Sequence, residues 1–142
     1  MRYDCGFEKG NNWFRYRAGG IIIHNNKMLF VKSCMGDYYY MIGGGVHMGE
    51  TSKDCIAREV YEEAGIHTCV DHLAVVCENF FKGIGGKIDG FDCHNSPVTH
   101  NCNRCIPIVY FIDSHIHTQP KTGITFYMLN SRNLPSKYVF LK

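Results

Sequence analysis

The chain has little charge imbalance and no long hydrophobic run. Its 142 residues carry 15 Lys and Arg against 13 Asp and Glu, a formal net charge of +2 with histidine neutral. So small an excess does not by itself indicate a nucleic acid or a membrane as a partner. The longest apolar runs, Gly20 to Ile23 and Ile106 to Ile112, are much shorter than the roughly 20 residues of a membrane-spanning helix.

No secretory leader is expected, and no internal repeat or domain linker is recognised in the sequence. The first ten residues, MRYDCGFEKG, contain no apolar segment typical of a signal peptide, so a cytoplasmic protein is expected. In that compartment eight cysteines predict free thiols or metal ligands rather than a disulfide framework. The length predicts one domain, residues 1–142, able to bury about two-thirds of its surface.

Several strand signals surround one clear helix. The runs Trp13 to His24 and Met28 to Ser33 predict a hairpin, because β-branched and aromatic residues flank an asparagine-rich turn. The glycines of residues 43–45 are expected to end a strand that runs from Asp37 to Ile42. This arrangement predicts an α/β or α+β sandwich. Further strands are expected at Leu73 to Phe81, Cys105 to Asp113 and Ile124 to Leu129, with the glycine-rich loop KGIGGKIDG between the first two.

The helix is expected from about Ser52 to Ala64. Thr51 is a favourable N-cap and Gly65 fits the position after the last turn. At 100° per residue, Ile56, Val60 and neighbouring apolar residues form a core-facing side.

Three glutamates crowd an adjacent stripe of this helix. Glu59 lies three and four residues before Glu62 and Glu63, so it faces both of them. Like charges at this spacing destabilise a helix by roughly 0.2–0.5 kcal/mol per pair. Two interpretations follow from the spacing: a solvated acidic face, or a site for a hard divalent cation such as Mg²⁺.

The residues around the glutamates favour the cation site. The segment GGVHMGETSKDCIAREVYEEAGI, Gly44 to Ile66, resembles the Nudix box of the Nudix hydrolases, with all nine defined positions filled. The resemblance implies an α/β/α sandwich around a mixed β-sheet. It also implies hydrolysis of a nucleoside diphosphate linked to another group X, by water attacking phosphorus, with Mg²⁺ or alternatively Mn²⁺. No membrane or nucleic-acid partner is expected, and a homodimer is compatible with the resemblance.

The same resemblance assigns roles to residues in and beside the box. Glu59 and Glu63 match the principal metal ligands, and Glu62 matches a further ligand or a water-activating base. The backbone carbonyl of Gly43 matches another metal ligand. The expected catalytic set is Glu62, Glu63 and Arg58, with Arg58 supporting the loop-helix geometry through a pair with Glu50.

Residues outside the box are assigned less sharply. Glu78 is a candidate base or a surface acid at a strand end, and Asp89 and Asp92 lie in the following loop, which is either a lid or a plain connection. Arg15 and Arg17 share one face of an early strand, where they bind substrate phosphates or line a solvated surface. The aromatic residues either form a platform on which a base stacks or belong to the hydrophobic core. They are Tyr38 to Tyr40, Phe80 and Phe81. Nothing in the sequence selects the group X.

The C-terminal third departs from the family pattern. The resemblance is strong from Trp13 to Phe81 and fades after about His94, where paired strands and a closing helix would be expected. A diverged fold and an altered reading frame both explain the departure. Cys102 and Cys105 form a CxxC that, with Cys93, His94 and His100, supplies zinc ligands or remains as free groups.

Two classes of function therefore stand at this point. The first is an active Nudix hydrolase. The second is a Nudix-fold nucleotide-binding or sensor protein that has lost turnover. The intact set of box glutamates favours the enzyme, and the unusual C-terminal third is the argument for the sensor.

Overall fold

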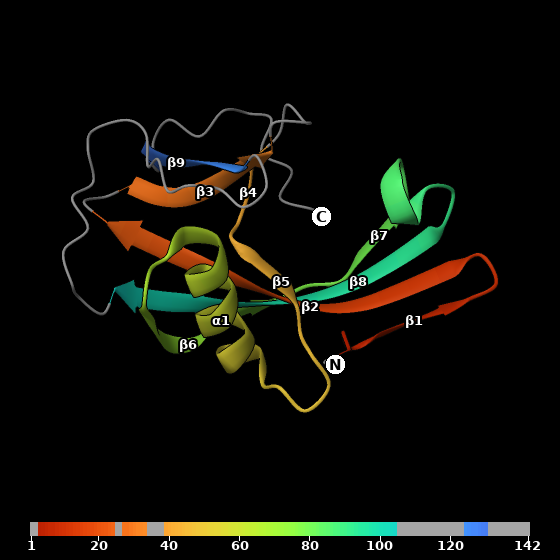
Figure 1. Cartoon of the computed structure of the whole chain (residues 1–142), viewed down its shortest axis with the longest axis horizontal. Coiled ribbons are helices and arrows are strands. Elements are labelled where there is room, and N and C mark those ends of the chain that lie inside the picture. The colour runs from red at the N-terminus through yellow and green to blue at the C-terminus, as the bar shows by residue number, and fades with distance from the viewer. Residues whose placement is uncertain (1–2, 25–26, 34–38, 105–123, 131–142) are drawn as a thin grey trace.

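The computed structural model describes residues 3–24, 27–33, 39–104 and 124–130, and nine strands, one α-helix and one 3₁₀ helix lie within them (Figure 1). The helices are α1 (Ser52–Ala64) and η1 (Gly86–Ile88). The strands are β1 (Gly6–Lys9), β2 (Asn12–His24), β3 (Lys27–Ser33), β4 (Tyr39–Tyr40), β5 (Gly43–Gly45), β6 (Thr68–Val76), β7 (Asn79–Lys82), β8 (Asp92–Arg104) and β9 (Ile124–Asn130).

Strand β2 organises the sheet. Along one edge it pairs antiparallel with β1, then β5, then β3. Along the other edge it pairs parallel with β8 from Asn12 to Ile22, and β8 in turn pairs antiparallel with β6 and β7. The sheet is therefore mixed, and α1 packs on it, as predicted (Figure 1).

Several predicted elements are confirmed. Strands β2 and β3 form the expected hairpin, α1 has the expected limits, and β9 matches the strand predicted from Ile124. The strand expected from Asp37 corresponds within the described residues to the two residues of β4. The strand predicted at Cys105 to Asp113, and the position of a closing helix, lie outside the described residues.

Three expectations about strands were wrong. The glycines 43–45 do not end a strand but form β5, whose backbone pairs with Arg17, Ala18 and Gly19. The segment Leu73 to Phe81 is not one strand, because β6 ends at Val76 and β7 begins at Asn79. Strand β8 was not predicted, because its polar sequence DCHNSPVTHNCNR shows no apolar alternation.

The core lies between α1 and one face of the sheet. Side chains alternate between the faces along β2, so Ala18 and Ile22 point toward α1, and a Cβ on Gly20 between them would stand 3.3 Å from Ile56. Val60 of the helix completes this contact and is fully buried. Arg15 and Arg17 consequently share the opposite face; their spacing predicted a shared face but not which one.

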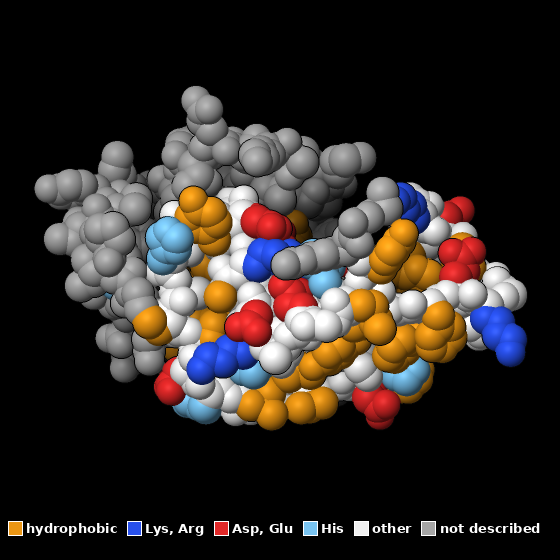
Figure 2. Space-filling model, turned by 60° about the horizontal axis from the view of Figure 1, so that its bottom comes forward, with side chains coloured by type: hydrophobic (Ala, Val, Ile, Leu, Met, Phe, Trp, Pro, Cys, Tyr) orange, Lys and Arg blue, Asp and Glu red, His pale blue; other side chains and the backbone are white. Residues whose placement is uncertain are grey.

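The surface carries both signs of charge. Figure 2 shows acidic and basic side chains close together near the middle of one face, with a band of hydrophobic side chains below and to the right of them. Exposed apolar residues include Phe7, Met48, Val76 and Phe80. Within the described part of the chain, no helix is long and apolar enough to cross a membrane.

Five of the described cysteines are free thiols, as expected, and Cys69 takes part in a disulfide. The free ones are Cys5, Cys55, Cys77, Cys93 and Cys102. Burial raises the pKa of Cys55 to about 12 and that of Cys102 to about 11, so both thiols stay protonated at neutral pH.

Candidate active site

Local signals fix the helix that carries the glutamates. The Thr51 hydroxyl accepts a hydrogen bond from the Asp54 backbone N–H and donates one to the Asp54 carboxylate, so the first turn is capped. At the other end Gly65 adopts φ 67° and donates its N–H to the Tyr61 carbonyl. These caps hold the glutamates of the last two turns in a defined position against β5.

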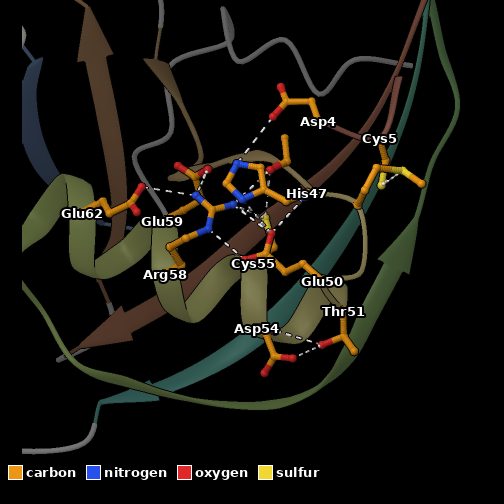
Figure 3. A network of polar contacts seen from close by, with 12 residues as sticks. Asp4, Cys5, His47, Glu50, Thr51, Asp54, Cys55, Arg58, Glu59 and Glu62 are labelled. Atoms are coloured by element: carbon orange, nitrogen blue, oxygen red, sulfur yellow. Dashed lines mark hydrogen bonds and ion pairs between the residues drawn. The ribbon is translucent and has the colours of Figure 1, made fainter. Parts of the chain in front are cut away.

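Arg58 joins the loop before the helix to the helix itself (Figure 3). Its Nε and Nη2 donate to the two oxygens of Glu50 at 2.8 and 2.9 Å. Its Nη1 donates to Glu59 at 2.7 Å and to Glu62 at 3.2 Å, and Nη2 also reaches the Gly45 carbonyl at 3.1 Å. One guanidinium therefore joins the loop, the helix and β5.

The Glu50 carboxylate is held in its charged form. Its side chain is only 8% exposed, and the hydrogen bonds from Arg58 lower its pKa to about 2 against the opposing effect of burial. The backbone N–H of His47 donates a further bond to it at 2.9 Å. A buried carboxylate satisfied in this way serves the structure and is not available as a proton acceptor at neutral pH.

We expect Glu50→Gln to lower the free energy of unfolding at pH 7 by about 2 kcal/mol, because a charge-assisted pair becomes a neutral contact. Since the folded pKa lies below the ordinary 4.5, the contribution of Glu50 is present above that value and is lost as the pH falls toward 2. Urea unfolding between pH 7 and pH 2.5 measures this. The gap between wild type and variant should close at acid pH, whereas Glu8→Gln, on exposed β1, should show no gap at any pH. A constant gap would contradict the assignment.

The glycines of β5 allow the helix glutamates to approach the sheet closely. A Cβ on Gly44 would stand 2.1 Å from Oε1 of Glu59, and a Cβ on Gly43 would stand 2.2 Å from the Ala18 carbonyl oxygen. At Gly43 the obstructing atom is backbone, which excludes a side chain, whereas a side chain at Gly44 would displace the Glu59 carboxylate. The carboxylate of Glu59, which is 14% exposed, therefore lies directly against the β5 backbone.

Glu63 occupies a different environment from the other two glutamates. Burial, and then the nearby Glu59 carboxylate, raise its pKa to about 7, although Arg17 and the Gly43 backbone act in the opposite direction. Its Oε2 is buried and has no hydrogen-bond partner among the described residues. Glu62, by contrast, is 55% exposed and pairs with Arg58.

The structure places Arg17 beside the glutamates. Its Nη2 lies 3.5 Å from the Gly43 carbonyl, and Glu59 and Glu63 act on it electrostatically. Burial, followed by repulsion from Arg15, lowers its pKa from the ordinary value, although a guanidinium remains charged. Arg15 is committed to an ion pair with Asp4, a contact that no sequence pattern predicted.

The residues present fit a divalent cation. No three His, Cys, Asp or Glu side chains of the described residues form a ready cluster, because Glu59 and Glu62 turn toward Arg58. However, Glu63 has a buried oxygen without a partner, and the Glu59 carboxylate lies close enough to disfavour its ionisation. A cation between these two carboxylates would satisfy the oxygen and remove the repulsion.

The candidate base outside the box, Glu78, and the two aspartates that follow it have local partners. Glu78 is 66% exposed and lies 3.4 Å from His94. Asp89 accepts the Gly85 N–H within its loop, and Asp92 pairs with Lys82. Each contact is of the kind found at strand ends and in loops, as the surface alternative for Glu78 predicted.

The described members of the zinc hypothesis do not come together. Cys93 and Cys102 are nine positions apart on β8, which corresponds to about 30 Å along a strand. His94 stacks on Phe80, and His100 Nε2 lies 2.9 Å from the Ser52 hydroxyl. Cys105 lies outside the described residues. This set therefore cannot share one tetrahedral ion.

The comparison with protein families decides the classification. The NUDIX domain model matches residues 13–115. The chain belongs to the Nudix family. The match continues past His94, where the motif-based resemblance faded, and so corrects that limit.

Curated relatives of the Nudix chain match over shorter stretches. A MutT-like protein of Streptomyces ambofaciens is 33% identical over 67 residues, which are 47% of this chain and 44% of that protein. The NAD-capped RNA hydrolase NudC of Vibrio parahaemolyticus is 59% identical over 29 residues, 20% of this chain and 11% of that protein. The chain thus matches less than half the length of either relative.

Solved Nudix structures share the fold at low sequence identity. A UDP-X diphosphatase matches with a TM-score of 0.57 and 16% identity, over 85% of this chain and 53% of that one. The MutT protein of Methanosarcina mazei matches with a TM-score of 0.55 and 17% identity, over 77% of both chains. These likenesses confirm the Nudix-type fold predicted from the box.

Proposed function

We propose that this Nudix chain, as one domain, is a Mg²⁺-dependent hydrolase of a nucleoside diphosphate linked to another group. The observation that carries the proposal is the buried oxygen of Glu63 without a partner, beside Glu59, in a complete Nudix box. The names of similar proteins agree with the proposed reaction class: a UDP-X diphosphatase and, with a TM-score of 0.51, an ADP-ribose pyrophosphatase of Streptococcus suis.

Glu59, Glu63 and the Gly43 carbonyl would hold the cation, with Glu62 at the solvent side. When bound, Mg²⁺ neutralises the charge of the diphosphate and orients the attacking water. Glu62, which is exposed, is the carboxylate able to accept a proton from that water, and Glu63 takes part by holding the cation. Attack at phosphorus depends mainly on this positioning and on electrostatic stabilisation.

Two cationic groups complete the site. Arg17, beside Gly43, is placed to bind a phosphate oxygen as a bidentate donor. Arg58 takes part through position, because its bonds to Glu50 and Glu59 set the distance between the loop and the helix. It therefore acts as a positioning residue of the catalytic set.

We expect millimolar Mg²⁺ or Mn²⁺ to raise the melting temperature of the metal-free protein by several degrees. Ligand binding to the folded state alone adds about 2.7 kcal/mol when the ligand exceeds its Kd a hundredfold. Differential scanning fluorimetry after EDTA treatment measures this, with Na₂SO₄ at equal ionic strength as control. An unchanged melting temperature with both metals would contradict the proposed cation site.

Hydrolysis of a substrate panel tests the proposed function itself. The panel contains ADP-ribose, UDP-glucose, NAD⁺, diadenosine tetraphosphate and nucleoside triphosphates, each with Mg²⁺ and with EDTA. Phosphate or nucleoside monophosphate release that requires metal on at least one member is the expected result. Binding of nucleotide without turnover on any member would favour the alternative, a nucleotide-binding or sensor protein, and overturn the hydrolase.

A further inference from the structure

A row of polar side chains crosses the sheet on the face opposite α1. Arg15 of β2 pairs in register with Asn95 of β8, and Asn95 pairs with Asn79 of β7. Residues directly opposite one another on paired strands project to the same face. These three side chains are therefore neighbours, and they are called the polar row below.

Each member of the polar row has a buried polar atom without a partner. Arg15 Nε, Asn95 Oδ1 and Asn79 Nδ2 make up half of the six such side-chain atoms found in the described part of the chain. Asn79 is 3% exposed and Asn95 is 7% exposed. A buried polar group left unsatisfied is destabilising by roughly 1–3 kcal/mol. The three atoms are two donors, Arg15 Nε and Asn79 Nδ2, on either side of one acceptor, Asn95 Oδ1, a set that a polar ligand carrying both acceptors and donors would satisfy.

The neighbours of the polar row differ on its two sides. Arg17 lies two residues beyond Arg15 on β2, which is about 7 Å along the strand, and contacts the Gly43 carbonyl beside the glutamates. Two residues in the other direction the register places Trp13, Cys93 and Phe81 on the same face. One face of the sheet thus passes from a phosphate-binding cation, through amides, to half-buried aromatic rings.

The atoms of the polar row favour a neutral heterocycle over a second phosphate. An anion accepts hydrogen bonds only, so it would leave the Asn95 oxygen unsatisfied. The edge of a nucleobase alternates donors and acceptors, and proteins read it with side-chain amides while aromatic rings contact its faces.

We propose that Asn95 and Asn79, with Arg15, form the subsite that reads the base of the substrate, with Trp13 and Phe81 contacting the ring. The subsite rests on the proposed function for its orientation, since Arg17 and the glutamates take the diphosphate. Asn95 and Asn79 are specificity-determining residues and take no part in the chemistry.

Calorimetric binding without metal tests the subsite separately from turnover. AMP, CMP, GMP, UMP and ribose 5-phosphate are titrated into the full chain. We expect at least one nucleotide to bind tenfold or more tightly than ribose 5-phosphate. Asn95→Leu and Asn79→Leu should each remove most of that difference and leave ribose 5-phosphate binding unchanged. Both variants should fold, because leucine replaces a buried amide that lacks a partner.

Asn101→Leu is the matched control on the same strand, since the Asn101 amide already bonds His72 and should leave the ranking unchanged. Equal binding of all five ligands, no binding of any, or an equal loss for ribose 5-phosphate in the Asn95 variant would overturn the subsite. Failure of hydrolysis with base-dependent binding intact would instead overturn the proposed reaction alone.

Discussion

Glu63→Gln should lower Mg²⁺-dependent turnover by about 100- to 10,000-fold, the range associated with loss of a proton-transferring or charge-stabilising group. The substitution keeps the shape of the side chain and removes the charge that would hold the cation. Initial rates under saturating Mg²⁺, with the substrate found in the panel, measure the loss. Glu8→Gln, on exposed β1, should keep the wild-type rate. A Glu63 variant within threefold of wild type would remove this residue from the catalytic set.

The same variant should be more stable than wild type when metal is absent. The folded pKa of Glu63, about 7, exceeds the ordinary 4.5, so the folded state binds its proton more tightly than the unfolded state. Stability of the metal-free wild type therefore falls as pH rises from about 4.5 to 7 and stays low above that. Glu63→Gln avoids this loss and, since solvent screens part of the repulsion, should gain on the order of 1–2 kcal/mol at pH 8, but nothing at pH 4. Equal stability at pH 8 would show that Glu63 carries no electrostatic penalty.

Gly43→Ala should destabilise the fold by about 2–6 kcal/mol. Gly43 has φ 150°, a conformation that residues with a Cβ rarely adopt, and the new methyl group would stand 2.2 Å from the Ala18 carbonyl oxygen. Backbone strain and overpacking each contribute about 1–3 kcal/mol. The obstructing atom belongs to the backbone of β2, so it cannot move aside without breaking the β2–β5 pairing. Urea unfolding measures the change.

Gly49→Ala separates the two causes. Gly49 also has a positive φ, 80°, but a Cβ there would meet nothing within 4 Å. It should therefore lose only about 1 kcal/mol, from backbone strain. If both variants lost the same amount, close packing against Ala18 would not be the reason for glycine at position 43.

The parts of the fold that sequence predicted are those specified by local chemistry. The limits of α1 follow from the Thr51 cap and Gly65, each of which acts within one turn of the helix. The β2–β3 hairpin follows in the same way from a turn between two apolar runs. Strand β8 had no such signal, because its polar residues are held in place by β2, β6 and β7 and not by their own propensity.

The candidate site likewise contains features that local sequence predicts and features that depend on distant strands. Arg58 and Glu50 could be paired from the box, and Arg15 and Arg17 could be placed on one face by alternation. Arg15 binds Asp4, whereas Arg17 reaches the Gly43 carbonyl. This difference depends on how β1 and β5 pair with β2, which the sequence pattern does not reveal. The unpartnered amides of Asn79 and Asn95 depend on β8, so no sequence pattern pointed to them.

The parallel pairing of β2 with β8 also sets the order in which the chain can assemble. At its far end Asn11 bonds Asp92 across 81 positions of sequence, and α1 and its glutamates lie between the two strands. Contacts between such distant residues close large loops before they add stability, which places folding in the millisecond-to-second range. A chain emerging during synthesis can form α1 and the β2–β3 hairpin early. The face that bears Arg17 and the polar row exists only once β8 has followed and paired with β2.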